Sequence, residues 1–439
     1  MMIARHMMAA IAAILLVALS AQRCLPQEPG VAPHPIGQAM TKAGEGKLLA
    51  AVALLEASGN KAEYRDVLAT FRSFLGDWRG AHQAADESYP KPPKGAVAFP
   101  QPVTHSSALE AIAEQAQHHR VLIVNESHHV PQHRAFILEM LRKLRGQGFQ
   151  YYAVETLAED VQDIQRRGYP VRNTGFYSVE PVFGDLIREA LAMGFQLVSY
   201  EAALDEATEG AATDPIESIN AREAAQCKNL MERLFAKDRE AKVIIHVGFD
   251  HALERPRKLK DGKEILWMAA RLARELGVDP LTIDQTLHTE RGTLHNATPQ
   301  WRQALDNGWL KQPLVLRQPN GSFLVTGHFA GLLDMQVFHP PTTLVDGRPN
   351  WLASSTGKGP VAIPAEMRDA SGRVLVQAFL ERESEDAIPV DQAILMPGKP
   401  RPKLFLRPGS YRLLAQDEQG NEVFKGPLVV AQSDNAKAG

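Results

Sequence analysis

Short apolar runs alternate with amphipathic stretches through the middle of the chain. Amphipathic helices are predicted between the runs, and the first begins at Pro131, carries its apolar side chains on one side and ends at Gly146. Near-continuous apolar strands that alternate with helices are typical of a parallel sheet covered on both faces. The pattern predicts an α/β domain over residues 101–350. Its strands are expected at residues 121–124, 151–154, 196–200, 243–247 and 281–283.

The pattern changes on either side of this domain. Residues 22–45 are rich in Pro, Gly and Gln and are predicted to form a flexible leader, whereas residues 46–100 show helical apolar spacing and then a Pro-rich linker. We expect a helical hairpin that caps the next domain, with a peptide-binding helical repeat as the alternative. Residues 359–435 carry alternating apolar residues between Gly, Pro and Asp turns, which predicts a small antiparallel β-sandwich. The expected fold class is α/β, a parallel sheet flanked by helices, between these two flanking units.

Residues 1–21 have the composition of a secretory signal peptide. Arg5 and His6 precede an apolar run from Met7 to Leu19, and small residues follow it. The run is too short to span a membrane comfortably, and no later segment is sufficiently long and apolar. We therefore expect an exported protein, periplasmic or secreted, with no transmembrane segment. A lipid anchor at Cys24 is the less favoured alternative because Arg23 precedes it instead of a small residue.

Composition limits the classes of function. The 439 residues carry 48 basic and 51 acidic side chains, well mixed along the chain, so nucleic-acid binding is not expected. Two cysteines exclude a disulfide framework. The sequence has neither a Gly-x-Ser-x-Gly elbow nor a phosphate-binding loop, and Cys227 lies within a predicted helix, where a buried thiol is inert. If the chain is an enzyme, water is the expected nucleophile.

Acidic and imidazole side chains follow each predicted strand. Because the carboxyl ends of parallel strands share one edge, where open α/β folds bind ligands, these groups are expected to meet there. Several carboxylates at one edge repel one another unless a positive side chain, a metal ion or shared protons offset their charge. Each glutamate taken singly would more simply cap the next helix; together they predict a site. The groups are Glu126, Glu155, Glu201, His246, His251 and Asp284.

Two kinds of side chain can balance these carboxylates. Arg222 lies close to the apolar side of a predicted helix, so its guanidinium reaches either the edge of the sheet or solvent. His128, His129 and His133 follow Glu126 at spacings compatible with metal ligation, although they match no strong zinc motif. The candidate ligands of a divalent metal are Glu126, His129, Glu155, His246 and His251.

These segments resemble the superfamily that joins erythromycin esterases, ChaN-like haem-binding uptake proteins and Tiki-type metalloproteases, over about residues 118 to 340. The family motif Gly-Glu-x-(x)-His appears as "NESHH", with Asn125 at the position usual for glycine, so that a side chain stands where the family leaves room. The later segments are "AVE" at 153–155, "SYE" at 199–201, "NAREAAQ" at 220–226 and "HVGFDHA" at 246–252. The resemblance implies a site formed by Glu126, the adjacent histidine, Glu155, Arg222, His246 and His251.

The resemblance leaves the identity of the adjacent histidine open. Erythromycin esterases place it three residues after the glutamate, which selects His129. ChaN-like proteins place it two residues after, with a second some five further on, which selects His128 and His133. Both spacings are present. The second branch implies a haem- or metal-binding uptake protein with these histidines as ligands.

The leading expectation is an exported hydrolase, esterase-like or metallopeptidase-like, that cleaves an ester, lactone or amide of a small-molecule or peptide substrate. Glu126 would take a proton from water with help from His129 or His246, while Arg222 or a metal stabilises the oxyanion. Glu126→Gln is then expected to lower turnover by at least two orders of magnitude without unfolding the protein. A third hypothesis assigns the function to partner binding by the C-terminal domain. No motif in the sequence encodes the substrate or the oligomeric state.

Overall fold

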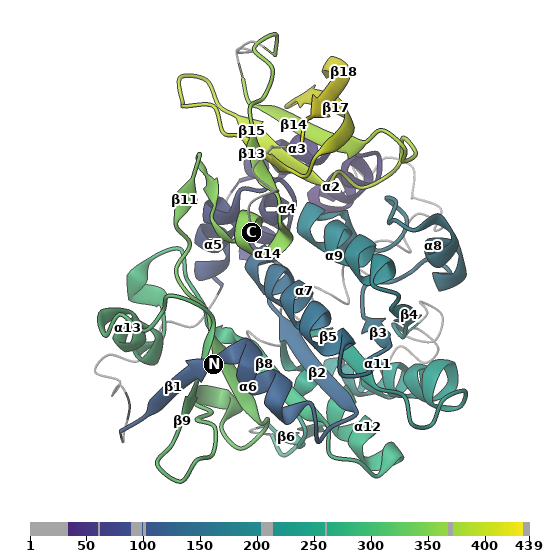
Figure 1. Ribbon diagram of the computed structural model, residues 1–439, viewed down its shortest axis with the longest axis vertical. Coiled ribbons are helices and arrows are strands. Elements are labelled where there is room, and N and C mark those ends of the chain that lie inside the picture. Colours follow the sequence, from purple (N-terminus) through teal and green to yellow (C-terminus); the bar gives the residue numbers. More distant parts are fainter. Residues whose placement is uncertain are drawn as a thin grey trace.

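The computed structural model describes residues 34–59, 62–88, 99, 102–202, 214–259, 261–367 and 372–432. The predicted signal peptide and Cys24 lie outside this part of the chain. Figure 1 shows a large central sheet with helices on its faces, and places the N-terminal helices and the C-terminal strands together at the upper end of the molecule. The expected fold class, an α/β protein with antiparallel strands at the C-terminus, is confirmed.

In the described part of the chain, four α-helices precede the α/β domain. The prediction of a flexible leader is wrong for residues 35–44, because α2 begins with Pro35 and buries Ile36, Ala39 and Ala43. Two of these three buried residues are alanines, so the apolar face is weak in the sequence. The predicted hairpin is thus part of a larger helical unit, which also contains a 3-10 turn at Ala62–Tyr64. The helices are α2 (Pro35–Gly44), α3 (Leu48–Ala57), α4 (Arg65–Phe74) and α5 (Trp78–Asp86).

The central sheet has eight strands in the order β1-β9-β10-β8-β2-β5-β3-β4. Strands β10, β8, β2, β5, β3 and β4 pair in parallel, whereas β9 pairs antiparallel with both β10 and β1. All five predicted strands lie in the parallel part. The strands are β1 (Thr104–Ser107), β2 (Val121–Glu126), β3 (Tyr151–Val154), β4 (Gln196–Ser199), β5 (Val243–Gly248), β8 (Leu281–His288), β9 (Leu314–Arg317) and β10 (Met335–Phe338).

Helices cover both faces of this sheet. Successive side chains of a strand point to opposite faces; Leu122 of β2 packs in the same core as Ile137 and Ile187, whereas Ile123 packs with Leu230 and Met268. Every residue of β2 and β5 is consequently buried. The helices are α6 (Ala108–Gln115), α7 (Pro131–Arg145), α8 (Val161–Arg167), α9 (Pro181–Ala192), α11 (Pro215–Leu230), α12 (Met268–Leu276), α13 (Pro299–Asp306) and α14 (Trp351–Thr356).

The C-terminal region is an antiparallel sheet in the order β15-β14-β17-β18, with a two-stranded sheet of β13 and β16 beside it. The two sheets share one apolar core. Strands β17 and β18 form a hairpin whose turn lies in "DEQGNE", residues 417–422, and Gly420 takes a φ of 84° in this turn. The strands are β13 (Gly359–Val361), β14 (Val374–Leu380), β15 (Asp391–Leu395), β16 (Leu404–Leu406), β17 (Gly409–Asp417) and β18 (Glu422–Val430). Two short hairpins elsewhere are β6 (Arg257–Lys258) with β7 (Glu264–Ile265) and β11 (Leu344–Val345) with β12 (Arg348–Pro349).

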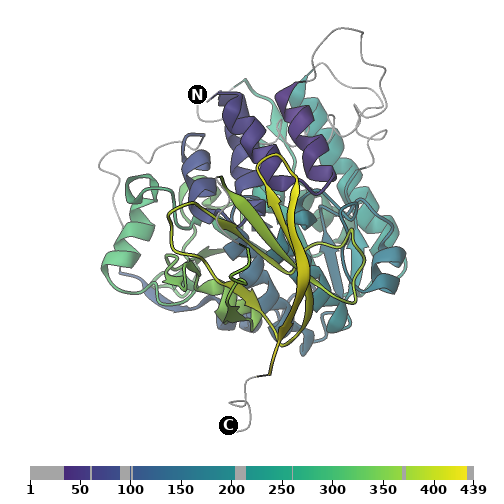
Figure 2. The same ribbon diagram turned by 90° about the horizontal axis from the view of Figure 1, so that it is seen from above.

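The C-terminal sheet and the N-terminal helices pack against each other. Leu375 of β14 lies in one apolar cluster with Phe71 and Phe74 of α4, and the Gln392 side chain donates a hydrogen bond to the carbonyl of Phe74. Figure 2 shows the C-terminal strands lying next to the N-terminal helices. Segments some 300 residues apart in the chain therefore share one core.

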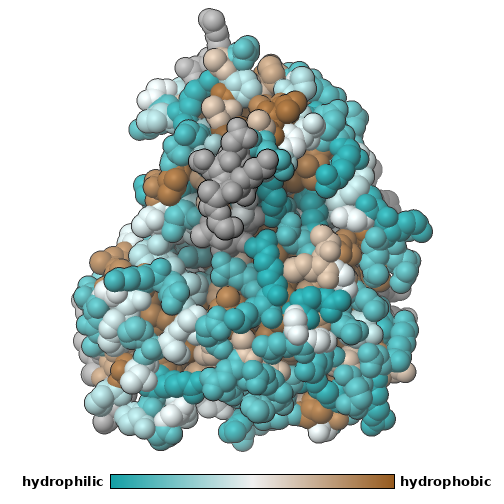
Figure 3. Space-filling model, in the orientation of Figure 1, coloured by the Kyte–Doolittle hydropathy of each residue, from teal (hydrophilic) through white to brown (hydrophobic). Residues whose placement is uncertain are grey.

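The face of the molecule seen in Figure 3 is predominantly polar. Figure 3 shows apolar residues in small separate patches on this face of the molecule. Within the described ranges, none of the helices combines the length and the apolar character needed to cross a membrane.

Candidate functional site

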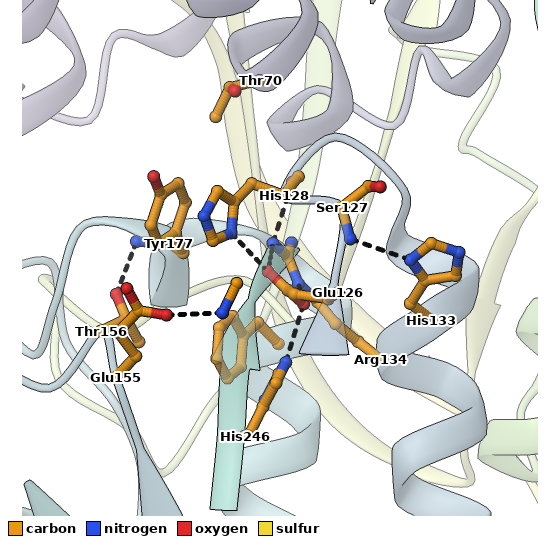
Figure 4. A network of polar contacts seen from close by, with 12 residues as sticks. Thr70, Glu126, Ser127, His128, His133, Arg134, Glu155, Thr156, Tyr177 and His246 are labelled. Carbon is orange, nitrogen blue, oxygen red and sulfur yellow. Dashed lines mark hydrogen bonds and ion pairs between the residues drawn. The ribbon is translucent and has the colours of Figure 1, made fainter. Parts of the chain in front are cut away.

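The carboxyl ends of β2 and β5 bring Glu126 and His246 together. The two strands pair in parallel, with Val124 opposite His246, so the end of β2 lies directly above the histidine. His246 Nε2 is 3.0 Å from Glu126 Oε2. Glu126 is only 1% exposed, and a buried charge needs partners to be stable. Figure 4 shows how these partners surround the carboxylate.

Glu126 accepts four hydrogen bonds. Arg134 of α7 donates from Nε to Oε2 at 2.7 Å and from Nη2 to Oε1 at 2.6 Å, and His128 Nδ1 lies 2.9 Å from Oε1. The fourth contact is that of His246. Burial raises the pKa of Glu126, but the positive charge of Arg134 and the interactions with His246 and His128 outweigh it and hold the pKa well below its usual range. Glu126 is therefore a permanently ionised carboxylate with both oxygens occupied.

Arg134 is a central residue of the site that the sequence analysis missed. Its guanidinium is completely buried and also donates from Nη1 to Glu180 Oε2 at 3.1 Å. Glu180 is the N-cap of α9 and accepts the backbone N–H groups of Val182 and Phe183, each at 2.9 Å. A signal was present in the sequence, since Arg134 stands directly before the apolar run "AFIL" at the start of a helix. An arginine on the apolar side of a helix needs a buried acidic partner.

Hydrogen bonds define the tautomers of the two histidines at Glu126. His246 donates from Nε2 to Glu126 and accepts at Nδ1 from the Tyr152 hydroxyl, 2.8 Å away. His128 donates from Nδ1 to Glu126, which leaves the lone pair on Nε2, and this atom has no hydrogen-bond partner among the described residues. The His128 ring stacks on Tyr177 at a centroid distance of 3.8 Å and an angle of 14°. Figure 4 also places Thr70 of α4 above His128, so the N-terminal helices lie over the site.

The structure distinguishes His128 from the neighbouring histidines. His128 is the one hydrogen-bonded to Glu126, whereas the His129 ring lies edge-on to His82 of α5 at 5.8 Å. His133 Nδ1 accepts the backbone N–H of Ser127 at 3.1 Å, and its ring lies 5.1 Å from that of His339. Burial lowers the pKa of both His129 and His133 well below the usual value. His129 and His133 thus belong to a neighbouring buried cluster of neutral histidines.

Arg222 lies between the glutamates that follow β3 and β4. Its Nη2 donates to Glu155 Oε1 at 2.6 Å and to Glu201 Oε2 at 2.5 Å, and its Nε donates to Glu201 Oε1 at 3.0 Å. Glu155 Oε2 accepts the backbone N–H of Gly248 at 2.6 Å. Burial raises the pKa of Glu155, but the charges of His251 and Arg222 outweigh it and lower the pKa to about 2. Both carboxylates are balanced by the guanidinium group.

His251 adds a second positive group beside Glu155. Its Nδ1 is 2.8 Å from Glu223 Oε1 and its Nε2 is 3.5 Å from Glu155 Oε1. Burial lowers the pKa of His251, but Glu223 and Glu155 raise it more, to about 9. His251 is therefore protonated at neutral pH, and its 3.3 Å approach to Arg222 Nη1 is a contact between two cations. Among the described residues, the carboxylates bind Arg222 through Nε and Nη2, and Nη1 has no carboxylate acceptor.

Gly248 joins the two groups of charged residues. A Cβ atom at this position would lie 2.6 Å from the His128 ring and 3.3 Å from Glu155 Oε2. Only a residue without a side chain allows His128 to lie this close to the end of β5. The structure thus brings together seven of the predicted residues: Glu126, His128, Glu155, Glu201, Arg222, His246 and His251.

Asp284 does not belong to this site. β8 continues to His288, so Asp284 lies within the strand, where it accepts a hydrogen bond from Asn125 Nδ2 at 2.9 Å. Asn125 also donates to the Phe249 carbonyl at 2.8 Å. The expectation that all five strands end at one site is wrong for Asp284. Asn125, at the glycine position of the motif, joins β2 to β8 and to the turn after β5.

The donor atoms do not fit a metal ion or a haem. The oxygens of Glu126 and Glu155 are already occupied by guanidinium, imidazole and backbone N–H groups, so a cation would have to displace Arg134 or Arg222. Within the described residues, no group of three or more potential ligands has the geometry of a metal site. His133, the second proposed haem ligand, is completely buried beside His339. The metal and haem assignments of the sequence analysis therefore do not agree with the arrangement of these side chains.

Comparison with known proteins gives only weak similarities. No protein-family profile and no curated protein matches the chain. A solved structure described as bacterial protein toxins covers 40% of this chain and 37% of its own, at 15% identity and a TM-score of 0.29. RRSP, a MARTX toxin effector domain from Vibrio vulnificus CMCP6, covers 50% and 43%, at 18% identity and a TM-score of 0.30. The match spans less than half of each of these chains, and the similarity is too low to assign a family.

Proposed function

We propose that this protein is a hydrolase in which His128 activates a water molecule that attacks an ester, lactone or amide. One observation carries the proposal. Glu126 orients His128 through Nδ1, while the lone pair of Nε2 has no partner among the described residues. A carboxylate that holds an imidazole in this tautomer is the arrangement by which hydrolases make histidine a general base.

Glu126 has a different role from the one expected from the sequence. A carboxylate with four hydrogen bonds and a strongly lowered pKa is a weak base. Its charge instead stabilises the imidazolium that forms when His128 takes a proton from water. His246 and Tyr152 hold the carboxylate in place from below, and Arg134 holds it from the side.

The same arrangement offers a group that can stabilise negative charge. Arg222 Nη1 has no carboxylate acceptor among the described residues and lies 3.3 Å from His251 Nε2, whose pKa is raised to about 9. Glu155 and Glu201 fix the guanidinium from the other side. We assign Arg222 Nη1 to the developing oxyanion, an interaction that typically contributes a factor of about 10² to 10³ in rate. The substrate class in this proposal is a small molecule or peptide with an acyl bond, and export rests on the signal peptide expected at residues 1–21.

The test is a comparison of two histidine variants of the purified full chain. Substrates are nitrophenyl esters, lactones and peptides, each with and without a chelator. His128→Ala is expected to lower kcat by a factor of about 10² to 10⁴ with activity unaffected by the chelator. His118→Ala, at an exposed histidine, is the matched control and is expected to leave kcat unchanged.

Two results would contradict the proposal. One is a His128→Ala variant that keeps more than a tenth of the wild-type kcat while remaining folded. The other is a protein that hydrolyses none of the substrates and instead gives a Soret band with added haem, lost in His128→Ala. That second result would support the haem-binding alternative.

A further inference from the structure

A cavity of about 820 Å³ lies between the α/β domain and the C-terminal sheet. It is bordered by the C-terminal half of α9, the start of β4 and residues of β14 and β17. The start of β4 is at the amino end of a parallel strand, whereas the residues around His128 lie at the carboxyl ends. The cavity is therefore separate from the candidate active site. Figure 1 shows α9 between the central sheet and the C-terminal strands.

Buried ion pairs form the inner wall of this cavity. Lys358 is only 3% exposed at its side chain and lies 3.2 Å from Asp185 Oδ2. Arg188 donates from Nε to Glu383 Oε1 at 2.8 Å and from Nη2 to Glu383 Oε2 at 2.5 Å. Buried pairs of this kind lose much of their Coulombic gain to desolvation, so they favour a defined geometry more than stability. They keep the wall polar and fixed.

The residues that line the cavity carry, taken together, an excess of positive charge. Five cationic and three acidic side chains line the cavity, although the whole chain is acidic, with a formal net charge of −3. Arg167 is neutralised by Glu159 at 2.8 Å, and Arg407 is shared between Asp185 at 3.5 Å and Glu189 at 3.1 Å. The cation left over is Arg382, an exposed residue that has no acidic partner in the part of the chain described here.

Apolar side chains complete the lining. Leu191 contributes from the end of α9, Phe195 from the α9–β4 connection, Leu380 and Val390 from the C-terminal region, and Tyr411 from β17. Sites for small organic ligands combine an apolar lining with a few polar groups and have volumes of about 300 to 1,000 Å³. Both the size and the lining of this cavity agree with that class.

We propose that this cavity binds a small amphipathic organic anion, whose carboxylate, sulfonate or phosphate group pairs with Arg382 and whose apolar body packs on Leu191 and Leu380. The proposal does not depend on the hydrolase assignment, because none of the residues around His128 lines the cavity. A guanidinium recognises each of these anions by paired hydrogen bonds, and one face of the ligand needs only apolar contact.

Binding can be measured with anilinonaphthalene sulfonate, an aromatic anion whose fluorescence rises in apolar sites. The full chain is expected to bind it saturably. Arg382→Glu is expected to raise Kd at least tenfold, whereas Lys311→Glu, the same charge change at an exposed lysine remote from the cavity, leaves Kd unchanged. Ala192→Trp, which places a large side chain at the cavity lining, is expected to remove binding without affecting far-ultraviolet circular dichroism, which reports the backbone fold.

The neutral analogue N-phenylnaphthylamine separates charge recognition from general apolar adsorption. It is expected to bind at least tenfold more weakly than the sulfonate and to be insensitive to Arg382→Glu. Equal Kd values for Arg382→Glu and Lys311→Glu would overturn the proposal. So would binding that does not saturate, or sulfonate binding that survives Ala192→Trp in a folded protein.

Discussion

Replacing Glu126 by Gln should destabilise the whole protein, contrary to the expectation from the sequence that this change affects turnover alone. The amide keeps the size of the side chain but loses its charge, and its NH₂ group faces the donors of Arg134, His128 or His246. Arg134 would then be balanced only by Glu180, although it is completely buried.

The expected magnitude follows from the burial of both partners. Removing one member of a buried ion pair costs about 3–5 kcal/mol, because the remaining charge stays uncompensated. Arg134→Met should cost a similar amount, since it leaves two buried carboxylates. The double variant removes both charges, so its loss should be smaller than the sum of the two single losses by about 2 kcal/mol or more.

Urea unfolding followed by tryptophan fluorescence at pH 7 measures the four free energies of this cycle. Turnover of each variant is measured without urea, at a temperature at which circular dichroism shows that the variant is folded. Single-variant losses that add within about 0.5 kcal/mol would refute the coupling. Glu126→Gln with the wild-type unfolding midpoint would refute the account of the network itself.

Three further predictions concern the same region. Gly248→Ala should lower kcat at least tenfold, measured at saturating substrate, because the new Cβ would lie 2.6 Å from the His128 ring; a wild-type kcat would contradict the geometry. The rate should fall as pH rises through about 9, the pKa to which Glu223 and Glu155 raise His251, and His251→Gln should remove that limb of the pH profile. The free energy of unfolding should be at its full value above about pH 6.5 and should decrease as the pH falls toward 3. Each buried neutral histidine is expected to contribute a loss of about 2 kcal/mol at pH 5, because its imidazole takes up a proton in the unfolded chain but not in the folded one. Acid titration of the urea midpoint tests this for the three histidines whose pKa burial lowers to about 3: His82, His288 and His339.

The parallel part of the sheet could be predicted because its strands are uninterrupted apolar runs between amphipathic helices. β8 was predicted too short because its second half, from Asp284 to His288, is mostly polar yet buried. Asp284 accepts hydrogen bonds from the side chains of Asn125 and Gln336, and the Gln285 side chain donates to the Asn125 carbonyl. These partners are distant in the sequence. Hydropathy alone cannot distinguish such a segment from a loop.

The site could be predicted only as a set of candidates. The strand ends of Glu126 and Glu155 are visible in the sequence, but the choice between His128 and His129 depends on how the turn after β2 directs two adjacent side chains. His128 turns toward Glu126, and His129 toward α5. Arg134 was not predicted as a site residue for another reason. The apolar periodicity of a helix does not indicate which charged residue lies on its buried face.

The shared core of the two ends of the chain has a consequence for biosynthesis. Tyr177, on which His128 stacks, packs in the same cluster as Phe71, Phe74 and Leu375. When only the first 350 residues have been synthesised, every charged group around His128 is present in the chain. β14, whose Leu375 packs in the same cluster as Tyr177, has not yet been made. The nascent chain should therefore not acquire the proposed activity until β14 has emerged.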